Sequence, residues 1–458
     1  MFTKLIRPLV CYWRGQGIRI VVYLDDGLGA AAGEAEATNV SRIVRSTLEL
    51  AGFVLNREKS VWQPTQRLQW LGFIIDTSLG QIEVPQEKIS RLIVELGKVL
   101  HATLVSARQL ASVVGRIISM GLAVGPVSRL MTRSLYSVLE SRGAWWELLS
   151  LPEEARKELE FWSRNLVEYK AQPIWHSPSA VRVVYSDASA TGYGGFIVEH
   201  GCYTAYGQWT AIEATHSSTW RELSGVWRVL QSLANKLSNN RVRWFTDNQN
   251  VARILQVGSR QPQLQEVALK IFSLTITCQI RLEPEWVPRE ENERADYLSR
   301  IIDLDDWFLN PAIFAQLDAR WGPHTIDRFA DCNNNQLVRF NSRCWNPGSE
   351  AVDAFTVDWS GETNWWCPPI ALIPRVIRHA QACSACGTLI VPSWLSAPFW
   401  PMLCPIRGRF APFVSEVVEL PQQEGLFLPS VSGAVLFNGE IPNTAVLALR
   451  CDFSLMSQ

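Results

Sequence analysis

The sequence predicts an α/β chain built from several domains. It has 458 residues, more than a single domain usually holds. Short runs of β-branched and aromatic residues, typical of strands, alternate with longer stretches in which apolar residues recur at helical spacing. Hydrophobic residues make up 47% of the chain, which is enough to fill more than one core.

Two segments form the N-terminal part of this prediction. Residues 1–84 contain a helical stretch, a strand–turn–strand, a second helix that ends at Gly52, and short strands joined by Gly turns. Residues 85–170 are predicted to be helical, because apolar residues recur there at helical spacing and Ser106 stands where an N-cap would stand.

Three more segments follow a predicted linker at 171–180, which contains two prolines among polar residues. Residues 180–302 alternate strands and helices, and they predict a mixed sheet with flanking helices. Residues 303–404 predict a smaller α/β module with a strand–helix–strand after a loop-rich start. Residues 405–458 predict a tail with strand-like runs and no assigned role.

Four acidic residues between 180 and 302 lie at the ends of predicted elements. Asp187 follows the β-branched run 181–185, and Asp247 ends a later predicted strand. Glu222 opens a helix, and Asp296 starts a short helix after a loop. We expect the four carboxylates to meet at one edge of a sheet.

An all-oxygen cluster of this kind suits Mg²⁺ or Mn²⁺ and the cleavage of a phosphodiester by two metal ions roughly 3.5–4 Å apart. Asp187 is expected to bridge both ions, because it lies on the first and central strand. Glu222 and Asp247 would complete the shell of one ion, and Asp296 would support the other. The alternative is four solvated surface acids, since Asp and Glu usually lie at the surface.

On these four acids, the region from about Ala180 to Arg300 resembles a ribonuclease H domain of the retroelement kind. The resemblance implies hydrolysis of the RNA strand of an RNA–DNA hybrid. Gly192, Gly194 and Gly195, in TGYGGFIVE after the first acid, would let a nucleic-acid backbone come close.

The resemblance also implies nucleic-acid contacts around the last acid. In related domains the loop before it carries a His or Asn that assists product release or metal positioning, and Asn292 is predicted in that role. Arg289 and Arg294 are predicted phosphate contacts. Arg116, in the helical segment, is predicted to follow a phosphate backbone, with a solvated helix face as the alternative.

The N-terminal segments carry a second resemblance. YLDD at 23–26 resembles the metal-binding hairpin of reverse transcriptases, LNREKS the next polymerase motif, and LGF at 71–73 the primer-grip hairpin. The resemblance implies a partial palm in residues 1–84 and a thumb and connection in residues 85–170.

One feature of the polymerase pattern is missing. Polymerase chemistry needs a third aspartate from an earlier strand, and no Asp or Glu precedes Asp25. We therefore expect an N-terminally truncated chain without RNA-directed DNA polymerase activity. Asp25, Asp26 and Lys59 would be a polymerase remnant.

Residues 303–404 resemble the region that follows ribonuclease H in DIRS-type, tyrosine-recombinase retroelements, a region likened to an adenine methyltransferase. Such enzymes have Asp or Asn before Pro-Pro and an aromatic residue after it, whereas Cys367 and Ile370 stand here. We expect a degenerate α/β module without this chemistry. The alternative is a working methyltransferase. Separately, four cysteines could form a zinc site, with buried small thiols as the other interpretation: Cys367, Cys383, Cys386 and Cys404.

Taken together, the motifs predict the reverse transcriptase and ribonuclease H region of a DIRS-type retrotransposon polyprotein, with RNA–DNA hybrid and other retroelement products as partners. A catalytically dead nucleic-acid-binding or interaction remnant is the alternative, since 43 basic residues balance 44 acidic ones. Dispersed cysteines and the lack of a signal peptide or membrane span predict an intracellular protein, cytoplasmic or nuclear and not secreted. The oligomeric state is left open.

Overall fold

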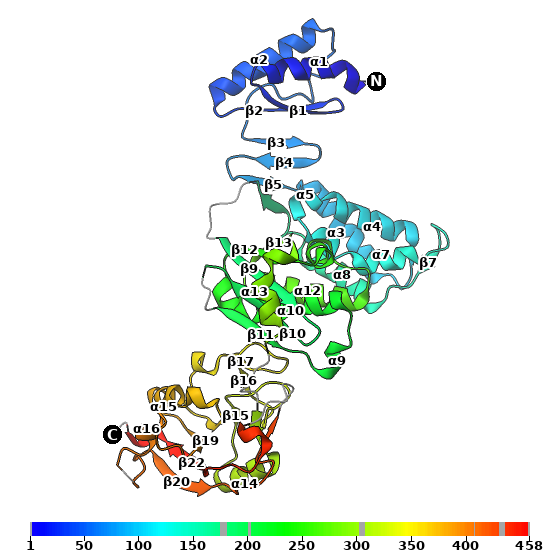
Figure 1. Cartoon of the computed structure of the whole chain (residues 1–458). Coiled ribbons are helices and arrows are strands. Elements are labelled where there is room, and N and C mark those ends of the chain that lie inside the picture. Colours follow the sequence, from blue (N-terminus) through cyan, green and yellow to red (C-terminus); the bar gives the residue numbers. More distant parts are fainter. Residues whose placement is uncertain are drawn as a thin grey trace. The chain divides into compact units, whose positions relative to one another are not determined.

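The computed structural model describes residues 2–174, 181–199, 203–301, 307–406, 408–429 and 436–456 (Figure 1). The chain forms two compact units. The first comprises Met1–Pro178 with Gln256–Arg260, and the second comprises Ser179–Leu255 with Gln261–Gln458. Helices and sheets occur in both, so the predicted multidomain α/β class is confirmed.

The first unit begins with α1 (Phe2–Gly15), the antiparallel pair β1 (Arg19–Tyr23) and β2 (Asp26–Ala30), and α2 (Glu34–Leu50). Trp13 is buried between the two helices, and its indole Nε1 donates to Thr47 Oγ1 at 2.7 Å. The predicted strand–turn–strand is present. Its assignment to a polymerase palm stays a prediction.

A four-stranded antiparallel sheet and a set of helices complete this unit. The sheet is β3 (Arg67–Trp70), β4 (Phe73–Asp76), β5 (Gln81–Glu83) and β8 (Ala171–Pro173). The remaining elements are α3 (Gln86–His101), β6 (Val105–Ser106), α4 (Ala107–Ser119), α5 (Gly121–Val124), α6 (Val127–Leu130), α7 (Arg133–Glu140), β7 (Leu148–Leu149) and α8 (Glu153–Asn165).

Two predictions for this unit can be compared with the structure. Ser106 caps α4 in a capping box with Gln109, as expected. The segment 171–180 was predicted to be a linker, but its first three residues form β8 and pair with β5. Residues 175–180 of that segment lie outside the described residues.

The second unit contains a five-stranded mixed sheet in the order β11-β10-β9-β12-β13. The first three strands are antiparallel neighbours, and β12 and β13 run parallel to β9. Its elements are β9 (Val181–Ala188), β10 (Gly192–Ile197), β11 (Thr204–Gln208), α9 (Ala211–Ala214), α10 (Ser218–Leu237), β12 (Arg241–Thr246), α11 (Gln249–Val257), α12 (Pro262–Thr277), β13 (Arg281–Trp286), the 3₁₀ turn η1 (Arg289–Glu291) and α13 (Glu293–Ser299).

Side chains of the central strands alternate between the two faces of this sheet, and helices cover both faces. Val184 on β9 and Trp244 on β12 are fully buried on the side of α10, and Trp244 Nε1 donates to Ser186 Oγ at 2.8 Å. On the opposite face, Leu298 of α13 packs with Phe196 of β10. The predicted mixed sheet with flanking helices is therefore present, and β9 is its middle strand.

The glycines of β10 make room for the chain's own helices. A Cβ on Gly194 would lie 2.5 Å from Leu298 of α13, and a Cβ on Gly195 would lie 2.6 Å from Val229 of α10. All six residues of β10 are buried. The prediction that these glycines admit a nucleic-acid backbone is wrong, because helices already fill that space.

A second five-stranded sheet, in the order β15-β18-β19-β22-β20, lies further along the chain. The elements are β14 (Trp307–Leu309), α14 (Pro311–Trp321), β15 (Ile326–Asp327), β16 (Asn341–Ser342), β17 (Ala351–Val352), η2 (Ala354–Thr356), β18 (Thr363–Trp366), η3 (Ile370–Leu372), α15 (Ile373–Ala382), β19 (Cys386–Pro392), α16 (Trp400–Leu403), β20 (Val414–Glu419), β21 (Phe427–Pro429), η4 (Leu436–Gly439), β22 (Val446–Asp452) and η5 (Phe453–Met456).

This sheet corrects the boundary predicted at residue 404. Strands β20 and β22 come from the segment predicted to be a separate tail, and β22 pairs antiparallel with β19 along all seven of its residues. Phe453, just after β22, belongs to the same buried core as Trp366 of β18. The α/β module therefore extends through the former tail.

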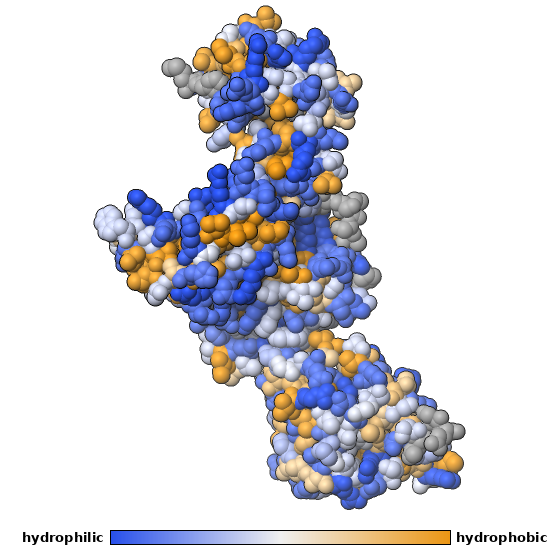
Figure 2. All heavy atoms as spheres, turned by 180° about the vertical axis from the view of Figure 1, so that it is seen from behind, coloured by the Kyte–Doolittle hydropathy of each residue, from blue (hydrophilic) through white to orange (hydrophobic). Residues whose placement is uncertain are grey.

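The surface is mixed in character. Figure 2 shows hydrophobic side chains in patches among hydrophilic ones on one face of the molecule. Among the described residues, no helix combines the length and the apolar character that crossing a membrane requires.

Candidate active site

Three predicted acids meet at one edge of the mixed sheet in the second unit. Asp187 lies near the end of β9, and Asp247 directly follows β12. Because these strands are parallel neighbours, their carboxyl ends share one edge. Glu222 comes from the first turns of α10, which packs closely here because Gly225 faces the end of β9.

The three carboxylates form a tight group. One oxygen from each of Asp187, Glu222 and Asp247 lies within 4.8 Å of the others. They line a cavity of about 450 Å³, which Asp296 also lines. The structure thus brings all four predicted acids to one cavity, with three of them in contact range of a single cation.

Burial and mutual repulsion make these acids hard to ionise. Burial, followed by the charges of Asp247 and Asp296, raises the pKa of Asp187 to about 6. Burial and the charges of Asp187 and Asp247 raise the pKa of Glu222 to about 9. Burial also raises the pKa of Asp247. A group of three acids in this state favours the binding of a cation that offsets their charge.

Asp296 differs from the other three because two arginines hold it. Arg289 Nη2 lies 3.0 Å and Arg300 Nη2 lies 2.6 Å from the same oxygen, Oδ1. Both arginine side chains are more than half exposed. Asp296 thus lines the cavity and forms ion pairs with two arginine side chains.

The other residues predicted around this acid have distinct positions. Asn292 is 1% exposed, and its Nδ2 donates to the carbonyl of Ser186 at 3.1 Å. This bond ties Asn292 to the backbone of β9. Its predicted part in nucleic-acid binding, through product release or metal positioning, stays a prediction. Arg294 is exposed, and its guanidinium lies 4.2 Å from the ring centroid of Phe196.

The candidates in the first unit lie apart from any such cluster. Asp25 lies in the turn between β1 and β2, Asp26 opens β2, and both are exposed, as is Lys59. Among the described residues, no group of three metal-ligating side chains includes these acids. Arg116 on α4 pairs with Glu95 at 2.9 Å and keeps 42% of its side chain exposed, so its contact with a phosphate backbone stays a prediction.

The cysteines proposed as zinc ligands also do not gather. None of Cys367, Cys383, Cys386 and Cys404 belongs to a metal-ligating group within the described part of the chain. Cys367 follows β18 and is buried, and burial raises the pKa of its thiol. The described residues therefore give the zinc alternative no support.

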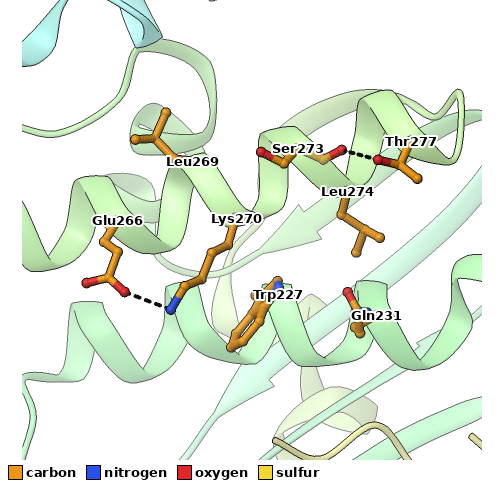
Figure 3. Close-up of a pocket in the computed structure, with 8 residues that line it drawn as sticks. All are labelled: Trp227, Gln231, Glu266, Leu269, Lys270, Ser273, Leu274 and Thr277. Carbon is orange, nitrogen blue, oxygen red and sulfur yellow. Dashed lines mark hydrogen bonds and ion pairs between the residues drawn. The ribbon is translucent and has the colours of Figure 1, made fainter. Parts of the chain in front are cut away.

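A second cavity, also of about 450 Å³, lies between α10 and α12 (Figure 3). Trp227 is one of the residues that line it, and the ammonium of Lys270, another lining residue, pairs with Glu266 at 2.8 Å. It contains no cluster of acids or nucleophiles, so the acidic cavity is the candidate active site.

Sequence reasoning missed two residues of this site. Ser299 Oγ donates to Asp187 Oδ2 at 2.8 Å, and Arg300 binds Asp296. The available signal was their spacing. Ser299, the last residue of α13, and Arg300, the residue after it, follow Asp296 by three and four positions, a spacing that places side chains on one side of a helix.

One family model matches the part of the chain that contains these acids. Residues 180–301 match the family described as reverse transcriptase-like. No curated protein matches the chain.

Several solved structures are similar to it. The foamy viral protease-reverse transcriptase is 15% identical, both in complex with RNA/DNA hybrid (66% of this chain, 41% of that chain, TM-score 0.33) and with dsDNA (62% and 58%, TM-score 0.33). RNase H1 from the halophilic archaeon Halobacterium salinarum NRC-1 is 18% identical over 26% of this chain and 94% of its own, with a TM-score of 0.23. The chain spans about half the length of the foamy viral chains.

Proposed function

We propose that residues 180–301 are a ribonuclease H-type endonuclease that hydrolyses the RNA strand of RNA–DNA hybrids with Mg²⁺ or Mn²⁺. The observation that carries the proposal is the meeting of Asp187, Glu222 and Asp247 within 4.8 Å at one edge of a mixed sheet. The family match over the same residues supports it.

The donor set fits a hard divalent cation. Carboxylate oxygens are the ligands that Mg²⁺ prefers, and the raised pKa values of Asp187 and Glu222 reflect charge that a cation would offset. Asp187, Glu222 and Asp247 would hold the metal, with Asp296 in support. When bound, divalent metal supplies an activated water and stabilises charge on the phosphodiester.

The surrounding residues would orient the substrate. Arg289 and Arg300 are exposed beside Asp296 and can exchange this carboxylate for a phosphate of the nucleic acid. The hybrid would be recognised through its shape and its 2′-hydroxyl groups. The finer origin, a DIRS-type retrotransposon with a polymerase remnant at the N-terminus, is part of the same proposal.

The direct test is a gel assay on a labelled RNA–DNA hybrid. The full chain should cleave the RNA strand with Mg²⁺ and not with EDTA. Asp247→Asn should abolish cleavage while the chain stays folded, because it removes a metal ligand and relieves repulsion. The matched control is Asp26→Asn, an exposed acid in the first unit, which should leave cleavage unchanged.

The same assay distinguishes the proposed endonuclease from a catalytically dead remnant. Such a chain would bind the hybrid in a gel shift without cleaving it under any metal condition. Cleavage by Asp247→Asn at the rate of the unchanged chain would end the assignment of the site.

A further inference from the structure

Three hydrogen bonds on either side of Asp187 join α13 and the residue before it to β9 and the residue after it. Asn292 Nδ2 donates to the carbonyl of Ser186 at 3.1 Å, and Ser189 Oγ donates to the carbonyl of Ser299 at 2.7 Å. Between them, Ser299 Oγ donates to Asp187 Oδ2 at 2.8 Å. Of these three bonds, only the last one reaches a carboxylate of the acidic group.

The Ser299 hydroxyl has few hydrogen-bond acceptors within reach. Its side chain is 1% exposed, so water does not compete for its single proton. Its two acceptors are Asp187 Oδ2 and the carbonyl of Asp296, at 2.8 and 2.9 Å. A carboxylate accepts a hydrogen bond more strongly than a peptide carbonyl, so Asp187 is the favoured acceptor of the two.

This bond restricts rotation of the Asp187 carboxylate. Ser299 cannot move freely with a turning carboxylate, because Leu298 and Ser299 lie directly against the backbone of Gly194. Asp187 is thus held in one orientation toward Glu222 and Asp247.

We propose that Ser299 is a positioning residue, whose hydroxyl orients Asp187 so that the three acids can bind a divalent cation. This inference rests on the proposed function, since the cation is the one that hydrolysis would use. It adds a residue outside the acidic quartet whose loss would weaken metal binding before any substrate is present.

The test measures Mn²⁺ binding to the full chain without nucleic acid. Binding is monitored as the loss of the electron paramagnetic resonance signal of free Mn²⁺. Ser299→Ala should weaken binding about 10-fold, as loss of an outer partner of a metal ligand commonly does. Ser299→Thr keeps the hydroxyl and should restore binding to within about twofold of the unchanged chain, which packing alone would not do.

Ser224→Ala is the matched control. Ser224 lies on α10, is 2% exposed, and its hydroxyl has no hydrogen-bond partner among the described residues. Its removal should leave Mn²⁺ binding unchanged. If Ser299→Ala does not fold, Ser299→Cys provides a side chain of similar size that donates only weakly, and it should also weaken binding.

The outcomes are distinct. Unchanged binding by Ser299→Ala or by Ser299→Cys would overturn the inference, and so would a Ser299→Thr chain that binds as weakly as Ser299→Ala. Asp187→Asn tests the parent proposal separately. If it abolishes binding, the metal site stands whatever Ser299 does, and if it binds as the unchanged chain does, both proposals fail.

Discussion

Burial determines how readily the clustered acids of the second unit ionise. Asp187 is 5% exposed, and the charge it carries when ionised faces two more carboxylates within 4.8 Å. Water normally stabilises such charges, so its exclusion makes the protonated forms more favourable. At the scale of single residues, the site is therefore a set of acids that need a cation to ionise together.

The pH dependence of stability follows from these shifts. Folding raises the pKa of Glu222 to about 9 and that of Asp187 to about 6. At pH values between the ordinary pKa of a carboxyl group and these raised pKa values, the two carboxyl groups are ionised in the unfolded chain but remain protonated in the folded chain. The melting temperature of the metal-free chain should therefore fall as the pH rises from about 4.5 to 9.

Circular dichroism melts with EDTA can measure this fall. Glu222→Gln should reduce it, because the amide does not ionise while Asp187 still does, and added Mg²⁺ should reverse it at high pH. Glu419→Gln, at an exposed position of β20, should retain the full slope. A metal-free Glu222→Gln chain with the slope of the unchanged chain would contradict the argument.

At the scale of elements, two helices are held in place by contacts with residues of other elements. Helix α13 carries Asp296 and lies directly on the backbone of β10, since Gly194 has no side chain. Helix α7 begins without a side-chain cap of its own, because the Thr132 hydroxyl donates to the carbonyl of Ser128 instead.

Gly194→Ala tests the contact of α13. The new Cβ would lie 2.5 Å from backbone atoms of Leu298 and Ser299, so the helix must shift, at a cost of about 1–3 kcal/mol. Because α13 carries Asp296 and Ser299, hybrid cleavage should fall more than thermal stability does. Gly115→Ala in α4 is the control, since nothing lies within 4 Å of its added Cβ and stability should rise slightly.

Glu158 of α8 supplies the missing cap of α7. It is 2% exposed, and its carboxylate accepts from the backbone N–H groups of Ser134 and Leu135 at 2.9 and 3.0 Å. Glu158→Ala leaves both groups unpaired and should destabilise the first turn of α7 by about 1–3 kcal/mol. Hydrogen exchange of a peptide covering 133–140 should report faster exchange.

The pH response of Glu158 distinguishes this cap from general packing. Burial raises the pKa of Glu158 to about 7, so its contribution to stability is lost as the pH rises toward 7. Glu158→Gln does not ionise, but it keeps only one acceptor oxygen for the two N–H groups. Its α7 should therefore be less protected from exchange than that of the unchanged chain at low pH, and this protection should not change as the pH rises through 7. Protection of α7 in the unchanged chain should fall over the same range, and an equal pH dependence in the two chains would contradict the assignment.

At the scale of the whole molecule, the sequence predicted local elements better than it predicted what they contact. The ends of β9 and β12 were visible because β-branched runs stop at Asp187 and Asp247. What fills the space above Gly194 was not visible, because a glycine permits any close neighbour and only the folded chain identifies α13 as that neighbour. The ion pairs of Asp296 likewise depend on side-chain geometry that spacing alone does not define.

The fate of the last segment illustrates the same limit. Strand-like runs after residue 404 were recognised, but strand pairing across distant residues leaves no local pattern. In the structure, β22 lies between β19 and β20, and buried residues such as Ala448 and Leu449 complete two cores. The segment is therefore part of the second sheet.

Truncation after residue 404 should consequently unfold the module that begins at Trp307. It removes the antiparallel partner of β19 along seven residue pairs and uncovers the core around Trp359 and Trp366, both of which are fully buried. Tryptophan emission should shift to longer wavelength, and limited proteolysis should degrade the module. A truncated module that resists protease would show that strands β20, β21 and β22 are dispensable.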